Sequence, residues 1–180
     1  QDSLNQDDPG DVRRVAVSVF KYTFLTEFFF GTVLALYFYY SLDMGFKGIY
    51  WGYWHAISGF CNAGFDLIGN FQSLVGFQGD VALNICFILL IVIGGLGFTV
   101  IDDLLEKRCW KGLSVHSKIV LVVNAILLIG GTVLIWLLEH HNPDTIGHVS
   151  GGQQWLASLF QSVSLRTAGF NTMDLASLTQ

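Results

Sequence analysis

The chain has 180 residues, of which 52% are hydrophobic and only 13% are charged, and its formal net charge at pH 7 is −5. Because the apolar residues lie in long blocks, this composition excludes an ordinary soluble domain and predicts an all-α integral membrane protein. Nothing in the composition or charge pattern indicates nucleic-acid binding, and we expect no nucleic-acid partner.

Three apolar blocks are long enough to cross a membrane. They are residues 22–40, 81–101 and 119–138. A helix of roughly 20 residues, with a rise of about 1.5 Å per residue, covers a hydrocarbon core of about 30 Å. The sequence therefore predicts a multi-pass protein of the cell membrane, in contact with membrane lipid.

The basic residues predict the orientation of these spans. Seven of the nine Lys and Arg residues lie before the first span or between the second and third: Arg13, Arg14, Lys21, Lys107, Arg108, Lys111 and Lys118. Because cytoplasmic segments carry the excess of Lys and Arg, we place residues 1–21 and 102–118 in the cytoplasm. Residues 41–80 and 139–180 are then on the outer side.

Two short sequences recur in the same order along the chain. GTVL occurs at 31–34 and 131–134, and AGF occurs at 63–65 and 168–170. A repeat of this kind indicates a duplicated structural unit. The predicted units are span, short pore helix and span in residues 22–101, and a second copy in residues 119–180 that stops after its pore loop. Because the first residue is Gln1 and the closing span is missing, we expect a piece of a longer protein.

The short apolar stretches that precede each AGF sequence predict re-entrant segments. Residues 51–60 form a helix of only about 15 Å, half of a bilayer, and both of its ends must lie on the outer side. The extended backbone that climbs back cannot satisfy its N–H and C=O groups in lipid. It must be buried in protein or line an aqueous cavity, so each stretch is either a structural elbow or a pore lining.

A pore lining would use backbone carbonyl oxygens, which can replace the hydration shell of a cation. Glycine allows the positive φ angles that such a turn requires, and small neighbours allow close approach. The candidate ion-binding residues are Asn62, Ala63, Gly64, Thr167, Ala168 and Gly169. We expect Phe65 and Phe170 to support these segments from behind. We also expect Arg166 to turn away from the path and to bond a carboxylate or loop carbonyls.

Four sequences resemble one known family: RTAGFNT (166–172), NAGFD (62–66), GGLGF (94–98) and SVHSK (114–118). The chain resembles the Trk/Ktr/HKT superfamily of potassium transporters, and most of all the bacterial Ktr-type membrane subunit. This resemblance implies four repeats around one pseudo-fourfold pore, of which the chain would hold the second and most of the third. It also implies that Gly64 and Gly169 are filter glycines and that the transported ion is K⁺.

The same resemblance implies partners and leaves functional alternatives open. It implies a homodimer of membrane subunits and a cytosolic ring of nucleotide-binding regulatory subunits. The basic loop at 107–111 faces that side, although its charges could simply set topology and contact lipid headgroups. The alternative function is a non-conducting structural or assembly subunit. An enzyme is not expected, because no predicted span carries a histidine or a pair of carboxylates.

Overall fold

The computed structural model of the protein describes residues 9–69 and 72–179, and this part of the chain is helical and contains no strand. The α-helices are α1 (Pro9–Leu36), α2 (Phe46–Phe60), α3 (Val81–Gly95), α4 (Phe98–Lys107), α5 (Val115–Glu139) and α6 (Gly151–Thr167). Short π or 3-10 segments are η1 (Tyr37–Ser41), η2 (Val75–Phe77), η3 (Trp110–Gly112) and η4 (Leu175–Ser177). The predicted all-α class is confirmed.

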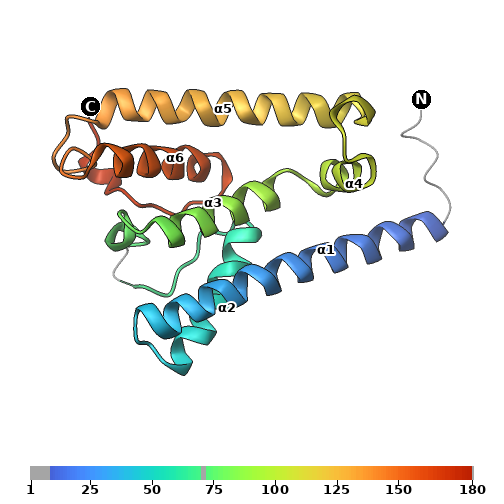
Figure 1. Ribbon diagram of the computed structural model, residues 1–180, viewed down its shortest axis with the longest axis horizontal. Coiled ribbons are helices and arrows are strands. Elements are labelled where there is room, and N and C mark those ends of the chain that lie inside the picture. The colour runs from blue at the N-terminus through green and yellow to red at the C-terminus, as the bar shows by residue number, and fades with distance from the viewer. Residues whose placement is uncertain (1–8, 70–71, 180) are drawn as a thin grey trace.

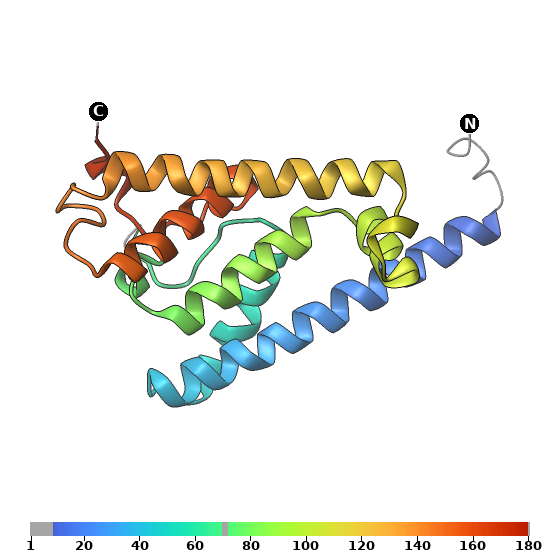
Figure 2. The same ribbon diagram turned by 45° about the horizontal axis from the view of Figure 1, so that its top comes forward.

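Within the described residues, two helices are long and apolar enough to cross a membrane by themselves. They are the continuous stretch Arg13–Ser41, of 29 residues, and α5, of 25 residues. These helices form two sides of the molecule; α3 and α6 lie between them, and α2 crosses α1 (Figures 1 and 2). The first predicted span is therefore present, but its helix starts at Pro9, within the segment predicted as a polar cytoplasmic tail.

The predicted span 81–101 is formed by two helices that together have the length and apolar character of a span but are joined by a sharp bend. α3 ends at Gly95, α4 begins at Phe98, and the two helix axes meet at an angle of 97°. Gly97 between them has a φ angle of +85°, which ends a right-handed helix and which residues other than glycine rarely adopt. α3 alone is about 22 Å long at 1.5 Å per residue, so it does not cross a bilayer unaided.

The half-length helices α2 and α6 pack against α3 in the centre of the molecule. They contain 15 and 17 residues, too few for a span. The fully buried aromatic side chains there are Phe38, Phe87, Phe160 and Phe170. The Phe87 ring from α3 lies 5.0 Å from the Phe170 ring and 6.4 Å from the Phe160 ring, measured between centroids. A shared core thus joins the two predicted repeats.

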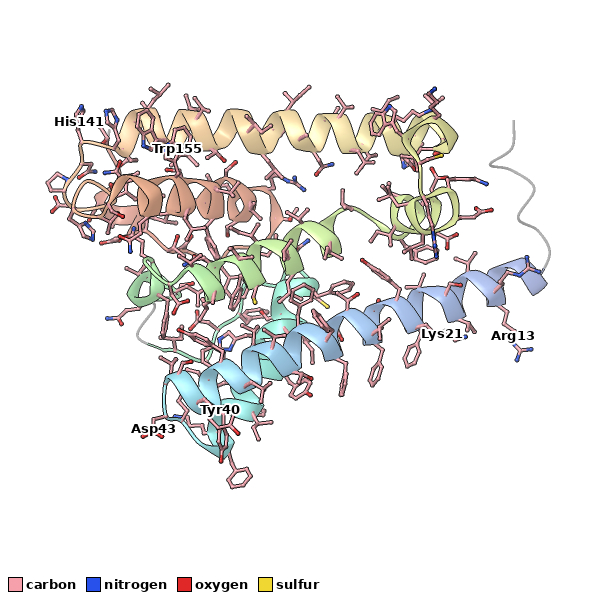
Figure 3. The ribbon with its side chains drawn as sticks, viewed as in Figure 1. Arg13, Lys21, Tyr40, Asp43, His141 and Trp155 are labelled. Atoms are coloured by element: carbon pink, nitrogen blue, oxygen red, sulfur yellow. The ribbon has the colours of Figure 1, made fainter. Side chains whose placement is uncertain are left out.

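The two ends of the molecule differ in the residues they carry. Arg13 and Lys21 lie toward the end where α4 meets the start of α5, whereas Tyr40 and Trp155 lie toward the opposite end (Figure 3). At that opposite end the rings of Trp136 and Trp155 stack with centroids 4.9 Å apart. Trp and Tyr side chains favour both membrane–water interfaces, so this cluster fits an interfacial position for that end, and the predicted orientation stays a prediction.

Candidate functional site

The two AGF sequences, 105 residues apart in the chain, lie against each other. We call residues 62–65 the first AGF segment and residues 167–170 the second AGF segment. A Cβ added at Gly64 would overlap the carbonyl oxygen of Ala168, and a Cβ added at Gly169 would lie 3.7 Å from the Gly64 Cα. The φ angles are +73° at Gly64 and +79° at Gly169. Both positions therefore require the freedom of glycine, and Gly64 also requires its small size.

Ser58, near the end of α2, closes the first AGF segment into a tight loop. Its carbonyl oxygen accepts a hydrogen bond of 2.9 Å from the Ala63 N–H, and its hydroxyl donates one of 2.7 Å to the Phe65 carbonyl. The Ser58 carbonyl, which has no partner within α2, is thus satisfied by Ala63. The Ser58 hydroxyl turns the Phe65 carbonyl back toward the helix. No residue of α2 donates a hydrogen bond to the Ala63 and Gly64 carbonyls, which lie between these two bonds.

Ser164, near the end of α6, does the same for the second AGF segment. Its carbonyl oxygen accepts hydrogen bonds of 2.9 Å from the Ala168 N–H and 3.4 Å from the Gly169 N–H, and its hydroxyl donates to the Phe170 carbonyl. An alignment on AGF places Val163, not Ser164, opposite Ser58. Because of this shift by one residue, an alignment of the two repeats does not pair Ser58 with Ser164, although both make the same contacts.

The candidate ion-binding carbonyls accept no hydrogen bond from any residue that the structure describes. This holds for Asn62, Ala63, Gly64, Thr167, Ala168 and Gly169, in contrast to the flanking Phe65 and Phe170 carbonyls. Ala168 is buried and Asn62 and Gly64 are half-buried, and carbonyls removed from water are normally paired with a donor, whereas Ala63, Thr167 and Gly169 are exposed. A run of unpaired carbonyls in two contacting loops has the chemistry of a site for a hard cation.

The two phenylalanines of the AGF segments lie in different surroundings. Phe170 is fully buried and packs on Phe87 behind the second segment. Phe65 is 69% exposed and so does not support the first segment within the described chain. The supporting role that we expected for Phe65 stays a prediction that depends on contacts with other parts of the protein.

Arg166, in the last turn of α6, lies beside both AGF segments and close to Gly95 at the end of α3. A Cβ added at Gly95 would be 3.7 Å from Arg166 Nη2, 3.2 Å from Asn62 Nδ2 and 4.0 Å from Thr167 Oγ1. Arg166 Nη1 and Asn62 Oδ1 are buried and find no hydrogen-bond partner among residues 9–69 and 72–179. The carboxylate or carbonyl partner that we expected for Arg166 is thus not present in this part of the protein.

His55 is a part of the site that sequence reasoning missed. The Leu67 N–H donates a hydrogen bond of 3.3 Å to His55 Nε2, so Nδ1 carries the proton and donates to the Trp51 carbonyl at 2.7 Å. The ring is fully buried and packs between Phe38 and Phe87. A neutral histidine therefore fixes the backbone that follows the first AGF segment. The sequence signal that could have identified His55 is its position as a polar residue within the apolar half-length helix of residues 51–60.

The membrane-length helices α1 and α5 are each followed by a half-length helix, α2 or α6, and then by a glycine turn. This arrangement defines an integral membrane protein built from repeated units of a span and a re-entrant helix. The family model for TrkH, described as a cation transport protein, matches residues 1–180. The chain belongs to this family, which confirms its predicted membership of the Trk/Ktr/HKT superfamily. It is thus an integral protein of the cell membrane, in a family of transporters.

Relatives in three bacteria extend this finding. Over its whole length the chain is 41% identical to the Ktr system potassium uptake protein B of Vibrio alginolyticus and 33% identical to that of Bacillus subtilis. Over 97% of its length it is 34% identical to the potassium/sodium uptake protein NtpJ of Enterococcus hirae. The chain spans 39%, 40% and 38% of these relatives, respectively.

Proposed function

We propose that the chain contributes part of a potassium-selective path across the membrane, in which backbone carbonyls of the two AGF segments coordinate K⁺. The observation that carries this proposal is the pair of contacting glycine turns, whose carbonyls are unpaired while the flanking Phe65 and Phe170 carbonyls are bonded to serines. The proposal is supported by relatives that are named for potassium uptake. No covalent chemistry is needed for this function.

The remainder of the path comes from other parts of the full-length protein. Two AGF segments touch along one side, and the free edges at Ala63, Phe65, Thr167 and Gly169 are exposed. Further copies of the unit on these edges would complete the pseudo-fourfold ring that the resemblance implies. The exposed Phe65 and the unpaired Arg166 Nη1 would then acquire their contacts from these copies.

Two further parts of the proposal concern assembly. The full-length protein forms a homodimer in the membrane and binds cytosolic nucleotide-binding regulatory subunits at the face that carries Lys107, Arg108 and Lys111. What supports this is the Ktr-type resemblance and the position of these basic residues at the α4–α5 end. A non-conducting structural subunit is the alternative, and the experiment on the glycine turns separates it from the ion path.

Replacing Gly169 with serine should lower the preference of the full-length protein for K⁺ over Na⁺. A Cβ has space there, so the substitution mainly strains the φ of +79° and shifts the neighbouring carbonyls. Strain of this kind costs about 1–3 kcal/mol, so we expect a fall of roughly tenfold. Potassium uptake, with and without competing Na⁺, is measured in cells that lack their own potassium transporters.

The matched control for this experiment is Gly69→Ser. Gly69 has a similar φ of +84° but lies outside the AGF segments, where an added Cβ meets no atom within 4 Å. This variant should transport K⁺ with the preference of the unmodified protein. If Gly169→Ser also leaves both uptake and ion preference unchanged, the AGF segments do not line the path and the structural alternative is favoured.

A further inference from the structure

The outer loop of the first repeat contacts the second AGF segment. We call residues 72–80 the outer strap. The Asn171 N–H donates a hydrogen bond of 3.0 Å to the Ser73 hydroxyl, and the Leu74 N–H donates one of 2.9 Å to the Asn171 carbonyl. Both polar backbone atoms of Asn171 are therefore paired with the outer strap. Asn171 lies only two residues after Gly169.

The strap residues that hold Asn171 are themselves firmly placed. Ser73 is 8% exposed and Leu74 is fully buried. Ser73 has a φ angle of +48°, a left-handed conformation that is uncommon outside glycine and asparagine. A buried residue held in this conformation indicates that the surrounding structure fixes it.

The far end of the outer strap is bonded to α3 and to the second repeat. Asn84, fully buried in α3, donates hydrogen bonds of 2.8 Å to the Phe77 carbonyl and 2.6 Å to the Asp80 carbonyl. Gln78 Nε2 donates one of 3.1 Å to the Thr145 carbonyl in the loop between α5 and α6. The strap is thus a rigid connection between α3 and the second repeat.

We propose that Ser73 is a positioning residue for ion selectivity, because it fixes the far end of the second AGF segment. This inference rests on the proposed function. Ser164 bonds the Ala168 and Gly169 N–H groups and the Phe170 carbonyl, and Ser73 bonds the N–H of the next residue, Asn171. The carbonyls of Ala168 and Gly169 lie between these contacts without a hydrogen-bond donor in the described chain, so the two serines set their positions.

The first AGF segment is anchored differently, which makes the role of Ser73 specific. Leu67, just beyond that segment, bonds to His55 of its own repeat. The second segment is held at its far end by Ser164 and Gln161 of its own repeat and, in addition, by Ser73 and Leu74 of the preceding repeat. The distance between the two sets of carbonyls therefore depends on the outer strap, and a change at Ser73 moves one set relative to the other.

The test is Ser73→Gly in the full-length protein. Glycine tolerates the φ of +48° and removes the CH2OH group, whose hydroxyl accepts from Asn171. Loss of one buried hydrogen bond should reduce the preference for K⁺ over Na⁺ by roughly three- to tenfold. Uptake is measured per molecule of protein in the membrane, with the same Na⁺ competition. The matched control is Ser150→Gly, which removes the exposed N-cap hydroxyl of α6 at little cost in stability, because glycine is also favoured at N-caps, and should leave the preference unchanged.

The outcomes separate this inference from the proposed function. If Gly169→Ser changes the ion preference and Ser73→Gly lowers only the amount or thermal stability of the protein, Ser73 is merely structural and the inference is wrong. If neither variant changes the preference, the proposed function fails as well. If the Ser73→Gly protein does not accumulate in the membrane, the Ser73→Cys variant is tested instead. Its thiol is a weaker acceptor of similar size, so it must shift the preference in the same direction, and an unchanged preference overturns the inference.

Discussion

Replacing Gly64 with alanine should abolish potassium uptake by the full-length protein. The added Cβ would overlap the Ala168 carbonyl oxygen, which belongs to backbone and cannot rotate away, and Gly64 has a φ of +73°. The two AGF segments would have to move apart, and the carbonyls of both would be displaced. Strain and overlap together should cost about 3 kcal/mol or more, a loss of uptake of at least roughly 100-fold.

The control for this prediction is Gly69→Ala, which separates backbone strain from overlap. Gly69 has a similar φ of +84°, but a Cβ added there meets nothing within 4 Å. We expect this variant to retain most of its uptake. Uptake by both variants is measured at equal amounts of protein in the membrane. If Gly64→Ala transports as well as Gly69→Ala, close contact between the AGF segments is not needed for transport.

The local features of the candidate site could be predicted from sequence because each depends on few neighbouring residues. A half-length apolar helix followed by Ala-Gly-Phe indicates a re-entrant turn, since glycine alone takes the required φ at low cost. Gly64 and Gly169 both have this conformation. The repeat placed them in equivalent positions, whereas their contact in space was not predicted and is seen only in the structure.

The bend between α3 and α4 could not be predicted in the same way. Residues 94–98, GGLGF, lie in an apolar run of the length of a span, and glycine is common in membrane helices. The bend is accompanied by tertiary packing, because a Cβ added at Gly94 would overlap the Phe60 carbonyl oxygen at the end of α2. That contact joins residues 34 positions apart and leaves no periodic signal.

The contacts that hold the second AGF segment were also outside the reach of sequence reasoning. Ser73 and Asn171 are 98 residues apart, and although Asn171 lies in RTAGFNT, Ser73 belongs to no motif that the sequence analysis recognised. Phe65 and Phe170 occupy matching positions in the repeat, yet one is exposed and the other is buried. A repeat predicts what two copies share, whereas these differences arise from the neighbours that each copy meets.

The position of the first AGF segment depends on a close crossing of α1 and α2. Gly48 and Gly52, four residues apart on one face of α2, lie against the backbone of the outer end of α1 and η1. A Cβ at Gly48 would be 2.7 Å from the Phe38 carbonyl carbon, and one at Gly52 would overlap the Ala35 backbone nitrogen. Small residues at this spacing let two membrane helices approach closely, and here they seat the helix that carries the segment.

Replacing Gly52 with alanine should therefore destabilise the folded protein and displace the first AGF segment. The added methyl group meets backbone atoms that cannot rotate away, so α2 must move outward, at a cost of about 2–3 kcal/mol. The control is Gly130→Ala in α5, where a Cβ meets nothing within 4 Å and the higher helix propensity of alanine should be neutral or slightly stabilising. Thermal denaturation of the purified proteins in detergent measures the difference. Equal midpoints for the two variants would show that the α1–α2 crossing relaxes freely and does not set the position of the segment.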